Sequence, residues 1–149
     1  MVASSGAGTI GMVQAVLWIW VHLLQFNVSN QTIHVEEDAH NKDYRPLPSG
    51  RISLYAATLL RWLLIPVCWT ISIRMGSKPL FSSIALSLLT IIHNELGGHA
   101  RSWILRNILN GLGLASFEMG AISVICMFYL RCLISSHPIY ILFRRKVRI

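Results

Sequence analysis

Charged side chains are scarce in this sequence, and acidic ones are the scarcest. The 149 residues include 13 lysines and arginines and 6 aspartates and glutamates, so only 13% of the chain is charged. Soluble domains average about 25% charged residues, and this composition therefore argues against an ordinary soluble domain. The mean hydropathy of +0.55 and the 54% of hydrophobic residues indicate an integral membrane protein.

Cysteine is also rare, and the basic residues lack a nucleic-acid-binding pattern. The three cysteines, Cys68, Cys126 and Cys132, fit no metal or disulfide spacing, and we expect them to be small core residues. The net charge is +7, but the bases lie between apolar segments or near the C-terminal end. No aromatic–basic ladder or zinc-finger spacing occurs, which excludes nucleic acid as a partner. The basic tail at 144–148 is instead expected at lipid headgroups.

Four apolar runs divide the chain, and each predicts a membrane-spanning helix. They occupy residues 9–26, 52–73, 80–93 and 103–130. The third is short for a span, which needs about 20 residues. We therefore expect an all-α fold: a multi-pass transmembrane bundle of about four helices, forming one domain over residues 1–149.

A few side chains stand out inside these runs. A lone charge within a bilayer is unfavourable, so we expect Arg61 and Glu118 to pair across helices. We expect His22 to be a packing histidine whose hydrogen bonds are satisfied. The small residues at 111–116 are expected to let two helices approach closely.

The polar residues concentrate between the first two runs, in residues 27–51, here called the motif segment. It holds four of the six acidic residues, Glu36, Glu37, Asp38 and Asp43, and the bases Lys42, Arg45 and Arg51. Such a polar block in an apolar chain predicts a site rather than a solvated surface.

The spacing within the motif segment suits a cation and an anionic ligand. If the first helix continues past residue 26, steps of three and four place five polar residues on one face: Asn27, Asn30, His34, Asp38 and Asn41. Mg²⁺ prefers oxygen ligands and takes only one or two carboxylates. The bases that follow can bind diphosphate oxygens, and Pro46 and Pro48 are expected to keep the chain extended. Spacing alone leaves open a hydrophilic connector that anchors two helices at the interface.

The segment reads Asn30-x-x-x-His34-x-x-x-Asp38, then Asn41-x-x-x-Arg45-Pro46-x-Pro48-Ser49-Gly50-Arg51. This pattern resembles the first aspartate-rich motif of the UbiA superfamily of intramembrane prenyltransferases, N-D-x-x-D-x-x-x-D followed by N-x-x-x-R-P-x-P-S-G-R. Residues 17–31 and 107–121 resemble a fungal branch of that superfamily, which includes membrane-bound terpene cyclases as well as prenyltransferase-like proteins.

The resemblance implies an enzyme that binds an isoprenyl diphosphate through Mg²⁺ and ionises it to an allylic cation inside an apolar cavity. Asn30 and Asp38 would then be catalytic metal ligands, with Glu37 as a further candidate ligand. The diphosphate-binding residues would be Asn41, Lys42, Arg45 and Arg51. The implied setting is isoprenoid secondary metabolism in the endoplasmic reticulum or another endomembrane, with the bilayer as the second partner.

The sequence also departs from the family pattern. Gln31 and His34 stand where the motif has aspartate, and no second D-x-x-x-D occurs. The family fold has nine transmembrane helices, and this chain holds the equivalents of the second to fifth. We therefore expect a truncated member or an incomplete gene model, which a second copy or a missing half would complete.

The sequence is compatible with several functions. The leading one is a terpene cyclase acting on a farnesyl-type diphosphate; the alternatives are a prenyltransferase with an aromatic or other acceptor, a catalytically inactive fragment, and a small membrane adaptor. A second polar group, Glu95, His99, Arg106, Asn107 and Asn110, either extends the diphosphate site or is ordinary loop polarity.

Overall fold

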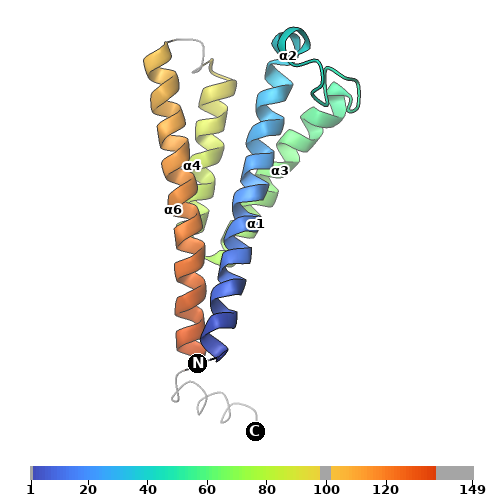
Figure 1. Cartoon of the computed structure of the whole chain (residues 1–149). Coiled ribbons are helices and arrows are strands. Elements are labelled where there is room, and N and C mark those ends of the chain that lie inside the picture. The colour runs from blue at the N-terminus through green and yellow to red at the C-terminus, as the bar shows by residue number, and fades with distance from the viewer. Residues whose placement is uncertain (1, 98–101, 137–149) are drawn as a thin grey trace.

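The computed structural model describes residues 2–97 and 102–136, with side chains for 9–97 and 102–134. Every element in these ranges is a helix: α1 (Val2–Ile33), α2 (Val35–Asn41), α3 (Leu54–Met75), α4 (Ser77–Asn94) and α6 (Trp103–Ser136). The four long helices run side by side, and α2 lies across the end where α1 and α4 finish (Figure 1). This arrangement confirms the predicted all-α membrane bundle. The basic tail at 144–148 and His99 lie outside the described residues.

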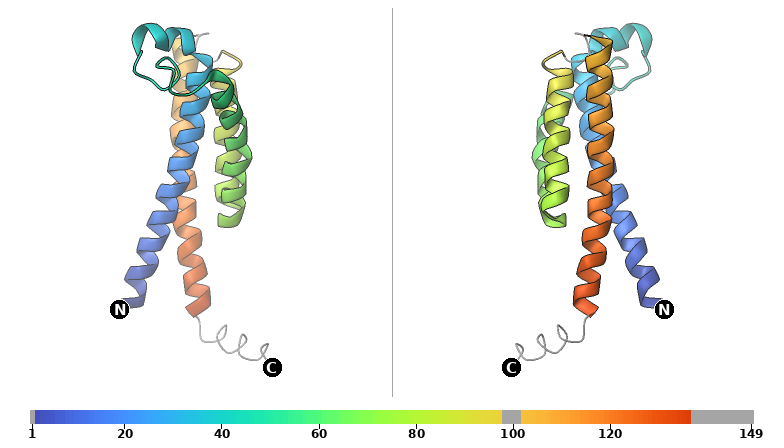
Figure 2. Two further views of the ribbon diagram at one scale, coloured as in Figure 1. Left: turned by 90° about the vertical axis from the view of Figure 1, so that its right-hand side faces the viewer. Right: turned by 90° about the vertical axis from the view of Figure 1, so that its left-hand side faces the viewer.

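Three of the described helices are long and apolar enough to cross a membrane: Thr9–Ile33 within α1, Leu54–Met75, and Trp103–Ile134 within α6. The predicted third run forms α4, whose 18 residues extend about 27 Å. Four serines and threonines of α4 are buried against its neighbours, so polar side chains replace the apolar ones that a lipid-facing helix carries. Figure 2 shows α1 and α6 extending beyond the shorter α3 and α4.

Local sequence signals set the connections between helices. Gly76 is the only residue between α3 and α4, and its φ of +139° lies in a region that favours glycine. Ser53 caps α3, accepting a hydrogen bond from the Ala56 N–H at 3.2 Å. The predicted extended conformation around Pro46 is wrong: the chain folds into consecutive turns there, in which the Ser49 N–H donates to the Arg45 carbonyl at 3.0 Å.

The packed centre of the bundle is built around Trp18 of α1, which is fully buried. Its indole N–H donates to Ser72 Oγ of α3 at 2.8 Å, and its ring contacts Gly120 of α6 so closely that an added Cβ would lie 2.1 Å from Cη2. The predicted close approach at 111–116 is wrong in position, because Gly111 and Gly113 have open space where a Cβ would project. The close approach occurs at Gly120 instead.

His22 is the packing residue that the sequence predicts. Its Nδ1 lies 2.7 Å from the Trp18 carbonyl, and its Nε2 lies 2.7 Å from Ser83 Oγ of α4. A neutral ring that donates from Nδ1 and accepts at Nε2 satisfies both nitrogens. The cysteine prediction holds only in part: Cys68 is buried, Cys132 is half-buried and Cys126 is exposed on α6, with all three thiols free.

Candidate functional site

The motif segment begins in the last turns of α1 and continues through α2 into the turns before α3. The helix breaks at His34, whose backbone angles are φ −104° and ψ 32°, and α2 starts with Glu36, Glu37 and Asp38 in its first turn. Acidic residues favour a helix N-terminus because of the helix dipole, which explains why a new helix starts here. The predicted single face is therefore divided between two helices, leaving Asn27 and Asn41 exposed and Asp38 buried.

Asp38 is the centre of the polar contacts in this segment. It is only 4% exposed, and its Oδ2 accepts a hydrogen bond from Arg45 Nη1 at 2.5 Å. Lys42 Nζ lies 3.9 Å from Oδ1. The spacings of four and seven residues thus bring one predicted metal ligand together with two predicted diphosphate-binding bases.

The other predicted site residues are more exposed than Asp38. Asn30 is half-buried in the last turn of α1, while Asn41 and Arg51 are exposed at the edges of the segment. Glu37 Oε2 lies 3.5 Å from His34 Nδ1, and the Glu37 side chain is 71% exposed. The segment therefore has a buried carboxylate with two bases and, on its surface, a second carboxylate beside an imidazole.

The donor chemistry fits Mg²⁺ only in one mode. Among residues 9–97 and 102–134, no group of three or more His, Cys, Asp or Glu side chains is placed to hold a metal. A cage built from three or more such side chains is therefore not formed in this part of the chain. Mg²⁺ usually binds through one or two carboxylates plus substrate phosphates and water, and Asp38, Glu37 and the amide of Asn30 supply donors of that kind.

A second polar cluster ties α1, α3 and α4 together below the motif segment. Arg61 of α3 forms an ion pair with Glu95 at the end of α4, and its Nη1 donates to Thr32 Oγ1 of α1 at 3.2 Å. The predicted pairing of Arg61 with Glu118 is wrong, because Arg61 pairs with Glu95 instead and Glu118 is exposed. Beside the ion pair, the Asn94 amide donates to Ser29 Oγ at 3.2 Å.

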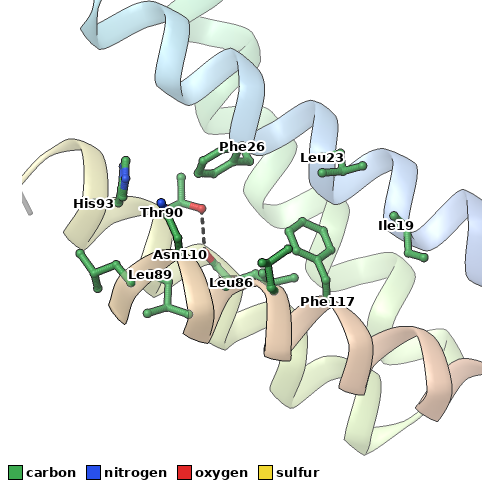
Figure 3. A pocket seen from close by; sticks show the side chains of 12 residues that line it. Ile19, Leu23, Phe26, Leu86, Leu89, Thr90, His93, Asn110 and Phe117 are labelled. Atoms are coloured by element: carbon green, nitrogen blue, oxygen red, sulfur yellow. Dashed lines mark hydrogen bonds between the residues drawn. The ribbon is translucent and has the colours of Figure 1, made fainter. Parts of the chain in front are cut away.

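An apolar pocket of about 500 Å³ opens between α1, α4 and α6. Ile19 and Phe117 line one end of the pocket, whereas Thr90, His93 and Asn110 lie with Phe26 toward the other end, where α1 leads into the motif segment (Figure 3). Phe26 and His93 meet there with ring centroids 6.1 Å apart. The volume lies within the roughly 300–1,000 Å³ of small-molecule pockets, which are mostly apolar with a few polar groups.

The sequence did not reveal this pocket, because residues from three separate helices form it. Of the second polar group, Asn110 lines the pocket, Glu95 belongs to the Arg61 ion pair, and Arg106 and Asn107 are exposed. Asn110 could have indicated the pocket from the sequence, since it is a polar residue on an otherwise apolar face. Gly113, which also lines the pocket, has space rather than a packing partner beside its Cα.

Comparison with known proteins finds relatives that are named synthases or cyclases. It is 33% identical over 109 residues to the fumagillin beta-trans-bergamotene synthase of Aspergillus fumigatus, covering 73% of this chain and 37% of that protein. It is 30% identical over 112 residues to the somaliensene A/B synthase of Streptomyces somaliensis, covering 72% and 35%. A diterpene cyclase of Hericium erinaceus is 44% identical over 48 residues, covering 32% and 15%.

The chain thus spans little more than a third of the length of the first two relatives, 37% and 35%. No solved structure matches it significantly. The UbiA prenyltransferase family matches residues 1–143, which is nearly the whole chain. The motif segment, the helical membrane bundle and this match together show that the chain belongs to the UbiA prenyltransferase family.

Proposed function

We propose that this chain binds an isoprenyl diphosphate and acts in terpene cyclisation as a Mg²⁺-dependent membrane enzyme. The observation that carries the proposal is the joint placement of two features at one end of the bundle. The buried Asp38 with Arg45 and Lys42 lies at the same end as the polar part of the apolar pocket. A diphosphate head requires basic side chains beside it, and its hydrocarbon tail requires an apolar pocket.

In this proposal the tail enters the pocket between α1, α4 and α6, and the diphosphate faces the motif segment. Arg45 and Lys42 shift from Asp38 to the diphosphate oxygens, where negative charge grows as the C–O bond breaks and the diphosphate leaves with the electron pair. Asp38, Glu37 and Asn30 would hold Mg²⁺, which would supply positive charge to offset the negative charge of the leaving diphosphate. The apolar lining excludes water from the allylic cation, which closes a ring and then loses a proton to the released diphosphate.

Two relatives that are named synthases and one named a cyclase favour cyclisation over prenyl transfer. A prenyltransferase would share the diphosphate site but would require an acceptor, such as an aromatic ring, as its second substrate. A catalytically inactive fragment would retain the motif segment without turnover, which the missing second aspartate-rich motif favours. A cyclase would release diphosphate from the isoprenyl diphosphate alone, a prenyltransferase only with an acceptor, and an inactive fragment not at all.

The test uses microsomes that contain the full 149-residue chain, supplied with farnesyl diphosphate and Mg²⁺. We expect diphosphate release with a cyclic hydrocarbon product, lost in Asp38→Asn and retained in Asp43→Asn. Asp43 is the matched control, because it is an exposed aspartate of the same segment. Turnover only with an aromatic acceptor would overturn cyclisation in favour of transfer, and absence of turnover would mean an inactive chain.

A further inference from the structure

A second cavity, of about 250 Å³, lies between α1, α3 and α6 toward the end of α3 that is opposite α2. Its walls combine apolar side chains, including Ile71, Val124 and Phe128, with two arginines, Arg74 and Arg131. Arg74 lies in the last turn of α3, where the apolar span Leu54–Met75 ends. The α3 side of the cavity is therefore placed where that span meets the aqueous phase, while the spans of α1 and α6 continue past it.

Backbone contacts fix one of the two guanidinium groups. Arg131 donates from Nη1 to the Arg74 carbonyl at 3.2 Å and from Nη2 to the Met75 carbonyl at 3.4 Å. These carbonyls are among the last four of α3, which have no partner within the helix. Guanidinium carries five N–H donors, so Arg131 retains donors for a ligand after it caps α3.

Among the described residues, no acidic side chain lies beside the charge in this cavity. Five of the six acidic residues, Glu36, Glu37, Asp38, Asp43 and Glu95, belong to the opposite end of the bundle. The sixth, Glu118, precedes Arg131 by 13 helical residues, or about 20 Å along α6. Arg74 and Arg131 thus combine with an apolar wall at a membrane boundary and face no carboxylate.

We propose that this cavity binds the phosphate group of an anionic membrane phospholipid, with Arg74 and Arg131 as its ligands. Arginine binds phosphate oxygens through paired N–H donors, and basic pockets between membrane helices hold anionic headgroups. Ile71, Val124 and Phe128 supply the apolar wall for the start of an acyl chain. Gln14, from α1, offers an amide to the headgroup. The site is separate from the motif segment and does not depend on the proposed catalytic function.

The test measures retention of labelled phosphatidylserine by the full chain, purified from vesicles of phosphatidylcholine with one-fifth phosphatidylserine. The informative variant is Arg74→Gln, which keeps the backbone carbonyl that Arg131 caps. The matched control is Lys78→Gln, because Lys78 is an exposed base at the same end that does not line the cavity. We expect about fivefold weaker retention for Arg74→Gln, from the roughly 1 kcal/mol that a hydrogen bond to the phosphate contributes, and unchanged retention for Lys78→Gln.

Two results would overturn the proposal. Equal retention by the wild-type chain and Arg74→Gln would show that the cavity does not bind the lipid. Saturable binding of inorganic phosphate in pure phosphatidylcholine vesicles, together with displacement of phosphatidylserine by that phosphate in the mixed vesicles, would identify a site for free phosphate rather than lipid. Arg131→Lys provides a second variant that keeps the charge but loses the paired donors, and we expect it to retain the lipid more weakly than the wild-type chain does.

Discussion

The ion pair between Arg61 and Glu95 gives the sharpest energetic prediction, because its two members differ in burial. The Arg61 side chain is 8% exposed and that of Glu95 is 30% exposed. Removing one partner of a buried pair destabilises a protein by about 3–5 kcal/mol, mainly because an unpaired charge stays buried. The size of the stability loss therefore depends on whether Arg61 or Glu95 is left unpaired.

We expect Glu95→Leu to lower the free energy of unfolding by about 3–5 kcal/mol, since it leaves the Arg61 charge buried. Arg61→Met leaves a carboxylate that can reach water, so we expect a loss of about 1.5–3 kcal/mol, the contribution of a charged hydrogen bond. The double variant should be more stable than Glu95→Leu alone, because no buried charge remains.

The assay is thermal unfolding in detergent, followed by a thiol-reactive dye that labels Cys68 as the bundle opens. Cys68 is 1% exposed, and the background replaces Cys126 and Cys132 with serine so that only the buried thiol reports. At roughly 2–4 °C per kcal/mol for chains of about this length, Glu95→Leu should melt about 6–20 °C lower. Additive effects in the double variant would refute the reasoning.

Three further predictions concern packing, the pocket and the metal. Gly113→Leu should lower kcat/KM for farnesyl diphosphate roughly tenfold, or about 1.4 kcal/mol, because the new side chain would occupy pocket space that the hydrocarbon tail needs. Gly111→Leu, outside the pocket, should leave kcat/KM unchanged, and equal effects of the two variants would contradict the role of the pocket. Gly120→Ala should lower Tm, because its Cβ would meet the buried Trp18 ring at 2.1 Å, and an unchanged melt would contradict this packing. Chelation with EDTA should abolish diphosphate release and added Mg²⁺ should restore it, whereas turnover that survives chelation would exclude the metal.

The sequence predicts the features that depend on neighbours along one helix. Apolar runs locate the four long helices, and the polar segment that the sequence places between the first two contains the cluster of Asp38, Lys42 and Arg45. His22 could be recognised as a packing residue because a lone histidine in an apolar span needs satisfied hydrogen bonds. These features follow from helical periodicity, which a single sequence carries.

Features that depend on which helices touch could not be read from the sequence. Arg61 pairs with Glu95 rather than Glu118 because α3 packs against α4, and nothing in the spacing of charges fixes that neighbour. The break at His34 similarly divides a face that continuous periodicity would keep together. The pocket and the close contact at Gly120 arise from several helices at once, so no local pattern predicts them.

The central claim is that the pocket between α1, α4 and α6 holds the hydrocarbon of an isoprenyl diphosphate whose head lies at the motif segment. Photolabelling with a diazirine analogue of farnesyl diphosphate, followed by peptide mapping, tests this most directly. We predict saturable labelling of α4 and α6 peptides that contain Thr90 and Asn110, displaced by farnesyl diphosphate and lost in Asp38→Asn but not in Asp43→Asn. Labelling that is unsaturable, falls outside the pocket helices or persists in Asp38→Asn would contradict the claim.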